Sequence, residues 1–254
     1  MKDHAKNNQI NSKYLEWDSG FLGFPVWEMS LPEKVDESQI KKILEEKRRA
    51  GVKLIYAHLS GAEKSSEVIE REGGLLVDRK LTFSKTIELP SPFLELPDTE
   101  IKRLASETST TKVYEQKLIE LAWEAGHFSR FRLDPQFPEL KFKELYRTWL
   151  LRSLAGEMAK VVLVKENPSG IPVGFVTINL VGSIGVIGLI AVDSSCRGQG
   201  IGSQLVRGAL VEMYKLGAKN AQVITQRENQ GACLLYHRTG FSILSEVVRY
   251  HFWL

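Results

Sequence analysis

The chain has 254 residues, 43% of them hydrophobic and 26% charged, so it can bury a full core as one large domain or two small ones. Its formal net charge of +3 and the lack of a lysine or arginine block argue against a nucleic-acid-binding protein. No apolar run approaches the ~20 residues that a membrane span requires, and residues 1–8 contain no apolar signal region. We therefore expect a cytoplasmic protein without a membrane partner, in which Cys196 and Cys233 remain thiols.

The N-terminal part predicts a small α/β domain. Its apolar residues recur at helical spacing in one stretch and form short strand-like runs in two others. Three prolines between Glu88 and Pro97 then stop both helix and central strand, which indicates a linker. We expect domains over 1–95 and 96–254. The expected elements before the linker are a helix over 37–50, a strand over 54–59, a short helix over 63–72 and a strand over 75–85.

The C-terminal part predicts helices and strands in a definite order. The turn Asn167–Gly170 carries proline and glycine where a hairpin favours them. Gly217 offers a C-cap to the helix that begins near Ile201. The expected elements are helices over 111–125 and 142–158, strands over 160–166, 171–180 and 186–193, a helix over 201–216, a strand over 221–225, a short helix that stops at Gly240 and a strand over 245–254.

Three alternate glycines stand between the strand over 186–193 and the helix that follows it: Gly198, Gly200 and Gly202. Backbone N–H groups at the start of a helix have no intrahelical partner and attract anions, so the pattern is typical of a phosphate-binding loop. A Walker A loop needs a lysine after its last glycine, and a dinucleotide fingerprint needs a further glycine at Ser203 or Leu205. Neither nucleotide motif fits. A glycine-rich turn without a ligand is the alternative.

The loop Arg197-Gly198-Gln199-Gly200-Ile201-Gly202 is similar to the Arg/Gln-x-x-Gly-x-Gly/Ala signature of the GCN5-related N-acetyltransferases (GNAT). The segment from Asn229 to Phe241 resembles their second signature, Asn-x-x-Ala-x-x-Leu-Tyr-x-x-x-Gly-Phe. The resemblance implies an α/β (α+β) fold with a mixed, mostly antiparallel sheet flanked by helices, acetyl-CoA as co-substrate and no metal. The acetyl-CoA contacts that it implies are Ile190, Ala191, Val192, Arg197, Gly198, Gln199, Gly200, Ile201, Gly202, Ser203, Asn229 and Ala232.

The same resemblance implies a chemistry of direct acyl transfer. Tyr236 holds the tyrosine of the second signature and is expected to protonate the departing thiolate, although a packing tyrosine is the alternative. Backbone N–H groups at Ile190–Val192 are expected to stabilise the developing oxyanion. Asp78 matches an acidic position of the resembled enzymes and is the expected base, with His127 as its rival.

The segment from Gly126 to Pro135 alternates arginines with aromatic residues. The planar fork of arginine suits phosphate oxygens, so Arg130 and Arg132 could hold a diphosphate while Phe128 or Phe131 stacks on a base or sugar. A loop with aromatic residues in the core and solvated arginines is an equally good interpretation of the residues alone. The candidate acceptor-binding residues are His127, Ser129, Arg130 and Arg132.

A narrower resemblance concerns the acceptor. Ser129–Arg132, Phe142–Trp149 and the early segment Leu15–Val26 look like those of dTDP-fucosamine acetyltransferases, whose acceptor is a nucleotide-linked 4-amino sugar for cell-surface polysaccharide. The chain departs from that pattern between Pro32 and Gly51. A GNAT enzyme acting on a protein N-terminus, a lysine or another small amine, and an acetyl-CoA-binding module without catalysis, remain open.

The apolar end of the chain, Tyr250–Leu254, is expected to be an exposed strand. An exposed apolar edge can pair with a second copy, so a homodimer is compatible with the sequence.

Overall fold

The computed structural model describes residues 10–60, 65–88, 101–104 and 111–254. Its contacts divide the chain into two compact units. Unit 1 holds the described residues up to Lys80 together with Ser129–Gln136 and Glu246–Leu254, and unit 2 holds Leu81–Phe128 and Phe137–Ser245. Ser129–Gln136 and Glu246–Leu254 thus belong to the same unit as the N-terminal part. The expected division into 1–95 and 96–254 is linear and places both segments in the second domain. Nearly all of the expected linker, from residue 89 onward, lies outside the described residues.

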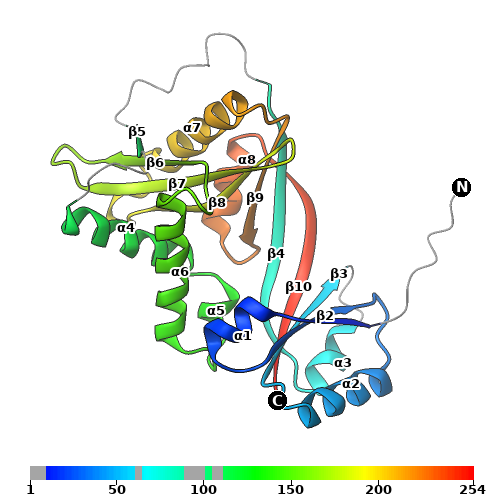
Figure 1. Ribbon diagram of the computed structural model, residues 1–254. Coiled ribbons are helices and arrows are strands. Elements are labelled where there is room, and N and C mark those ends of the chain that lie inside the picture. Colours follow the sequence, from blue (N-terminus) through cyan, green and yellow to red (C-terminus); the bar gives the residue numbers. More distant parts are fainter. Residues whose placement is uncertain (1–9, 61–64, 89–100, 105–110) are drawn as a thin grey trace, which may run out of the picture. The chain divides into compact units, whose positions relative to one another are not determined.

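Unit 1 is built on a mixed sheet (Figure 1). Its strands follow the order β1-β2-β3-β10-β4, in which β2 and β3 are parallel and β10 runs antiparallel to β3. The strands are β1 (Asn11–Tyr14), β2 (Val26–Leu31), β3 (Leu54–Ser60), the first half of β4 (Leu75–Thr86) and the second half of β10 (Ser242–Trp253). The helices are α1 (Glu16–Leu22), α2 (Glu37–Arg49), α3 (Ser66–Arg71) and α5 (Arg130–Leu133).

The two faces of the unit 1 sheet differ in chemistry because successive side chains of a strand point to opposite faces. One face is apolar and packs against α2 and α3 through residues such as Ile55, Ala57 and Ile40. The other face carries polar side chains. In register, Tyr56 lies opposite His251, and His58 lies opposite Arg249. These four residues, together with Glu28 of β2, form the surface that is called the polar face below.

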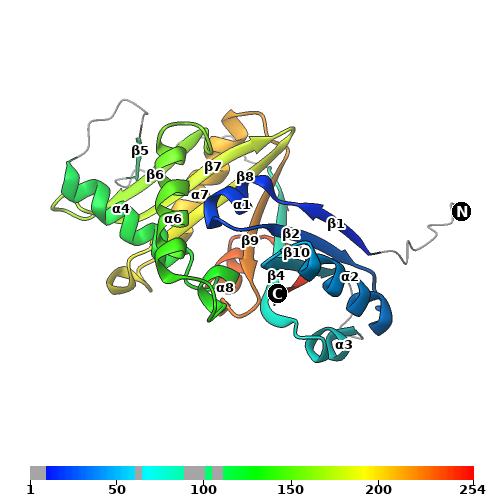
Figure 2. The ribbon, with the colours of Figure 1, turned by 60° about the horizontal axis from the view of Figure 1, so that its bottom comes forward.

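Unit 2 contains the remaining strands (Figures 1 and 2). Their order is β4-β9-β8-β7-β6-β5, with β8 and β9 parallel and β5 to β8 antiparallel. Helix α7 packs on one face through Leu205, Ala209 and Met213, and α4 contacts β7 and β8. The strands are β5 (Ile101–Leu104), β6 (Val161–Glu166), β7 (Pro172–Val181), β8 (Ile184–Val192) and β9 (Asn220–Gln226); the helices are α4 (Lys112–Ala125), α6 (Glu139–Leu154), α7 (Ile201–Lys215) and α8 (Gln230–Arg238).

The two units share one order of elements. In unit 1 the order β2-α2-β3-α3-β4 contains a parallel pair, β2 and β3, and in unit 2 the order β8-α7-β9-α8-β10 contains the parallel pair β8 and β9. Their first helices differ at the start. Asp36 caps α2 by accepting from the Ser38 N–H, whereas Gly200 begins α7 without any side-chain cap. An acidic cap repels phosphate, so only α7 of this pair begins as an anion site.

Every secondary-structure element expected outside the linker is confirmed, with ends shifted by a few residues. Strands β1, β2 and β5 and helices α1 and the short α5 were not expected from the sequence. The expectation of an exposed final strand is wrong: β10 pairs with β3, and His251 and Phe252 are at most 1% exposed. The end of the chain therefore offers no exposed strand edge that would favour a homodimer. Among the described residues no helix is both long and apolar enough to cross a bilayer.

Candidate functional site

An opening between two parallel strands of unit 2 defines the first part of the site. The ladder between β8 and β9 runs from the pair Ile184 and Asn220 to the pair Ile187 and Val223. Beyond it β8 continues to Val192 and β9 to Gln226, with no further pairing between them in the described part of the chain. The last five residues of β8 thus have one edge open.

Backbone N–H groups of β8 point into this opening. The Leu189 N–H donates to Thr177 Oγ1 at 2.7 Å and the Asp193 N–H to the Val173 oxygen at 2.9 Å, so both face β7. Because N–H groups alternate along a strand, the N–H of Ala191 also faces β7, and those of Ile190 and Val192 face the open edge. Of the three residues expected to contact acetyl-CoA here, two present donors to the opening.

The glycine loop follows directly. Gly198 and Gly200 have φ of 80°, a left-handed conformation that side chains disfavour, and a Cβ at either would meet no atom within 4 Å. These glycines are therefore required by backbone conformation, and the space in front of them is open. Ile201 is buried in the hydrophobic core of unit 2, and a Cβ at Gly202 would contact the Leu235 side chain at 3.2 Å. Gln199 is exposed and Ser203 half-buried.

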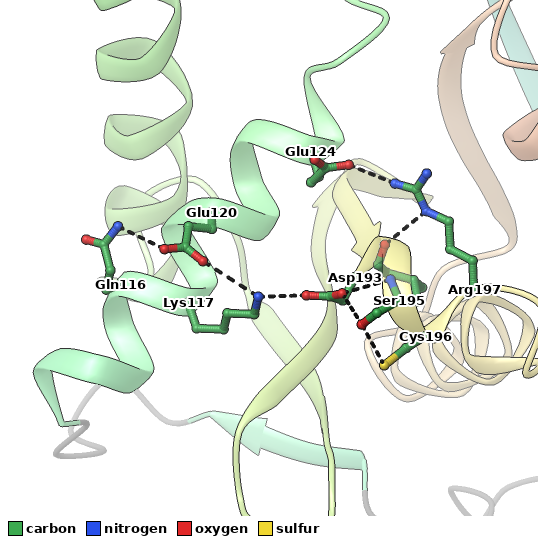
Figure 3. Close-up of polar contacts among 9 residues, drawn as sticks. Gln116, Lys117, Glu120, Glu124, Asp193, Ser195, Cys196 and Arg197 are labelled. Carbon is green, nitrogen blue, oxygen red and sulfur yellow. Dashed lines mark hydrogen bonds and ion pairs between the residues drawn. The ribbon is translucent and has the colours of Figure 1, made fainter.

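Ion pairs fix the entry to the glycine loop (Figure 3). Asp193, at the end of β8, pairs with Lys117 of α4 at 2.6 Å and accepts from Ser195. The Lys117 hydrogen bond, with those of Ser195, lowers the pKa of Asp193 to about 2. Arg197 donates from Nε to the Val192 oxygen at 3.2 Å and pairs with Glu124 at 2.8 Å. The side chain of Arg197 thus anchors the loop to β8 and α4.

Tyr236 lies on α8 within the core of unit 2. It is 2% exposed, with its ring centroid 5.5 Å from that of Phe83 and 6.0 Å from that of Phe241. Burial, followed by the nearby Cys233, raises the pKa of the Tyr236 hydroxyl well above its ordinary value. The phenol is therefore protonated at physiological pH. Asn229 accepts from the Ala232 N–H at 3.2 Å, so both residues also serve to cap α8.

Arg130 lies on the polar face of unit 1. Its guanidinium carbon stands 4.1 Å from the ring centroid of Tyr56 and 4.6 Å from that of Phe131. Within the described ranges the guanidinium makes no hydrogen bond or close ion pair, and its Nε is buried without a partner. Asp18 and Glu28 interact with it only electrostatically. A half-buried guanidinium with unused donors is suited to an anion.

Two carboxylate–histidine pairs flank Arg130 on unit 1. His58 Nε2 lies 2.6 Å from Glu28 Oε1, and its buried Nδ1 has no partner among the described atoms. Desolvation, partly opposed by the hydrogen bond to Glu28, lowers the pKa of His58 and so favours the neutral ring. His251 Nδ1 lies 2.6 Å from Asp134 Oδ2, which also accepts from Trp253 Nε1 at 2.9 Å.

The other expected acceptor residues are placed differently. Ser129 belongs to unit 1 and is 7% exposed, and its buried Oγ lacks a partner in the part of the chain that the structure describes. Arg132 belongs to unit 1 and is exposed. His127 is an exposed residue of unit 2 whose ring contacts Phe128. Asp78 is 4% exposed and lies 3.8 Å from Arg249 across the polar face.

The comparisons with known proteins agree with this architecture. Residues 116–241 match the sequence model of the acetyltransferase (GNAT) family. A GCN5-related N-acetyltransferase from Sphaerobacter thermophilus superposes with a TM-score of 0.58 at 18% identity, over 96% of this chain and 76% of that one. The chain belongs to the GNAT family of acetyltransferases.

Two curated relatives are N-alpha-acetyltransferases. This GNAT chain is 28% identical over 135 residues to N-alpha-acetyltransferase 30 of Saccharomyces cerevisiae, which is 47% of this chain and 77% of that protein. It is 33% identical over 67 residues to N-alpha-acetyltransferase 30 of Schizosaccharomyces pombe, which is 26% of this chain and 45% of that protein. The second alignment thus spans less than half of the relative.

The residues of unit 2 fit the acetyl-CoA that the GNAT fold implies. The open glycine loop, the uncapped start of α7 and the outward N–H groups of Ile190 and Val192 can hold a pyrophosphate and a pantetheine arm. Within the described ranges no group of three or more histidine, cysteine, aspartate or glutamate side chains could hold a metal ion.

Replacement of Gly200 by alanine tests this loop. We expect the dissociation constant of CoA to rise by about 10-fold or more, because a Cβ would stand in the open space in front of the loop and strain its backbone. Isothermal titration calorimetry with CoA measures it. Gly217→Ala is the matched control, since Gly217 has φ of 84° and open space but ends α7. Equal losses of CoA affinity in both variants would mean that the loop does not bind the phosphates.

Proposed function

We propose that this GNAT enzyme transfers the acetyl group of acetyl-CoA to the amino group of a nucleotide-linked amino sugar of the dTDP-4-amino-4,6-dideoxygalactose type, in the cytoplasm, for cell-surface polysaccharide. The observation that carries the proposal is the guanidinium of Arg130, which stacks on Tyr56 and makes no hydrogen bond or close ion pair in the described part of the chain. A diphosphate supplies the charge-assisted hydrogen bonds that this group lacks.

The reaction is a direct attack within a ternary complex. The neutral amine forms a C–N bond with the thioester carbonyl carbon, the C–S bond breaks, and the products are an N-acetyl amide and CoA thiol. One proton leaves the amine and one reaches the thiolate sulfur, so no covalent intermediate on the enzyme is needed. Holding both substrates together supplies several kcal/mol by removing translational freedom.

Residues of unit 2 are proposed for the donor side of this reaction. The N–H groups of Ile190 and Val192 are the candidates that stabilise the oxyanion, because they are the β8 donors at the open edge. Tyr236 is the candidate that protonates the thiolate, since burial keeps its phenol protonated. For removal of the proton from the acceptor amine, the sequence predicts Asp78 as the base, with His127 as its rival.

A second candidate function is acetylation of a protein N-terminus. It is favoured by the similarity to the yeast N-alpha-acetyltransferase 30, whose aligned part covers 47% of this chain. That share leaves about half of the chain without a counterpart in the relative. A peptide N-terminus carries no diphosphate and gives Arg130 no comparable partner.

An acceptor panel distinguishes the two functions. Thiol release from acetyl-CoA is measured with dTDP- and UDP-linked 3-amino and 4-amino sugars and with a pool of peptides that have free N-termini. We expect turnover with the dTDP-linked 4-amino sugar to exceed that with every peptide. Turnover on peptides alone would exclude the sugar, and no turnover on any acceptor would favour a cofactor-binding module.

Arg130→Ala is expected to raise the KM for the nucleotide sugar by about 10- to 100-fold, the loss of one or two hydrogen bonds to a charged group. Steady-state kinetics at saturating acetyl-CoA measure it. Arg49→Ala is the control, because Arg49 is an exposed arginine of α2 in the same unit. If the KM were unchanged in both Arg130→Ala and Arg132→Ala, the acceptor site would lie elsewhere.

A further inference from the structure

A second arginine stands on the polar face of unit 1 beside Arg130. We propose that Arg249 is the second guanidinium of an anion site that holds the acceptor's diphosphate, and that Asp78 is a positioning residue that holds Arg249. The inference rests on the proposed function for the identity of the acceptor. Neither residue has this role in the sequence analysis, where Arg249 was not singled out and Asp78 is the expected base.

The strand register brings the two arginines together. Arg249 of β10 pairs with His58 of β3, and the next pair on the same face is His251 with Tyr56. Positions two residues apart on a strand lie about 7 Å from each other. Arg130 covers Tyr56, with its guanidinium carbon 4.1 Å from the ring centroid. The two guanidinium groups therefore sit over neighbouring positions of one sheet face.

The donors of Arg249 are largely unused. Its side chain is 22% exposed, its Nε is buried, and among the described residues no atom bonds to that Nε. The one ion pair that it makes there, with Asp78, is 3.8 Å long, which exceeds hydrogen-bond distance. Buried arginine donors without acceptors cost free energy, so this arrangement is suited to an anion that brings its own acceptors.

The charges around Arg249 favour the same ligand. Desolvation, followed by repulsion from Arg130, lowers the pKa of Arg249 to about 10, and desolvation followed by repulsion from Arg249 lowers that of Lys80. Asp78 and Glu28 oppose these shifts, and Glu28 is already bonded to His58. A diphosphate between Arg130 and Arg249, with one negative charge on each phosphate, would offset the repulsion among the cations.

The surroundings of Asp78 suit a positioning role better than that of a base. Its carboxylate is 4% exposed and lies against the guanidinium of Arg249. A neighbouring arginine stabilises the charged form of a carboxylate and so weakens it as a proton acceptor. Although 3.8 Å is too long for a hydrogen bond, the attraction between the two charges favours conformers in which the long side chain of Arg249 points toward Asp78.

Binding of dTDP to the full chain saturated with CoA tests the proposal, since CoA then occupies the phosphate loop of unit 2. Calorimetry is expected to give a dissociation constant that rises about 10-fold or more in Arg249→Gln and several-fold in Asp78→Asn. Arg249→Lys keeps the charge without the planar fork and is expected to weaken binding too. Arg49→Gln serves as control and is expected to bind like the wild type.

Two results would overturn the proposal. One is a wild-type chain that binds no dTDP, and the other is unchanged dTDP affinity in Arg249→Gln or, should that variant fail to fold, in folded Arg249→Lys. Asp78→Asn with unchanged dTDP affinity and a lowered kcat would return Asp78 to the role of base. The proposed function fails on a different result, acetylation of peptides alone in the acceptor panel, whatever the affinity for dTDP.

Discussion

Replacement of Tyr236 by phenylalanine is expected to lower kcat by about 100-fold or more while the dissociation constant of CoA stays near that of the wild type. The change removes one hydroxyl and keeps the ring that packs against Phe83 and Phe241. General acid catalysis by a positioned side chain typically contributes 10²- to 10⁴-fold. Thiol release at saturating acetyl-CoA and acceptor measures the loss.

The packing role of Tyr236 needs its own control. Tyr214→Phe removes a hydroxyl from α7 at a side chain that is 43% exposed, and it should leave kcat unchanged. Thermal unfolding of Tyr236→Phe shows whether the core of unit 2 is preserved. A Tyr236→Phe variant that is folded and fully active would show that another group protonates the thiolate.

The glycine loop of unit 2 and the motif at Asn229 could be recognised in the sequence because their structural requirements are local. Gly198 and Gly200 are required by their own backbone angles, and the helix that follows begins at the next residue. Asn229 caps α8 by accepting from the N–H of Ala232, three residues further along the chain. Such short-range requirements leave a motif that can be recognised without knowing what packs around it.

The surroundings of Arg130 on the polar face could be predicted only in part. Arg130 was identified from its aromatic neighbours, but its stacking partner Tyr56 comes from β3, and His251 lies 117 residues from Asp134. Long-range pairs of this kind depend on the order of strands, which no local pattern specifies. The sequence alone therefore indicates no role for His58 or His251.

A signal for the polar face was nevertheless present in the strands. Tyr56 and His58 alternate with buried Ile55, Ala57 and Leu59, and Arg249 and His251 alternate with buried residues of β10. Polar residues at every second position of an apolar strand indicate a sheet with one polar face. The sequence could therefore predict that such a face exists, though not that β3 and β10 form it side by side.

Asp134→Ala is expected to lower the free energy of unfolding by about 3–5 kcal/mol, the cost of removing one partner from a buried pair. Asp134 is 2% exposed, and its carboxylate accepts hydrogen bonds from His251, Trp253 and the Gln136 N–H. The substitution leaves these three donors without an acceptor. Urea unfolding measures the loss. Asp36→Ala, which removes the exposed cap of α2, should cost only about 1 kcal/mol.

The same pair makes stability depend on pH. Desolvation, only partly opposed by Asp134, lowers the pKa of His251 to about 4 from 6.5. Between these values the unfolded chain binds more protons than the folded one, so the contribution of neutral His251 is complete above pH 6.5 and is lost as the pH falls toward 4. The loss amounts to about 3 kcal/mol at most. In His251→Gln the pH dependence of the free energy of unfolding between pH 4.5 and 7 should become shallower, and an unchanged slope would mean that His251 does not titrate abnormally.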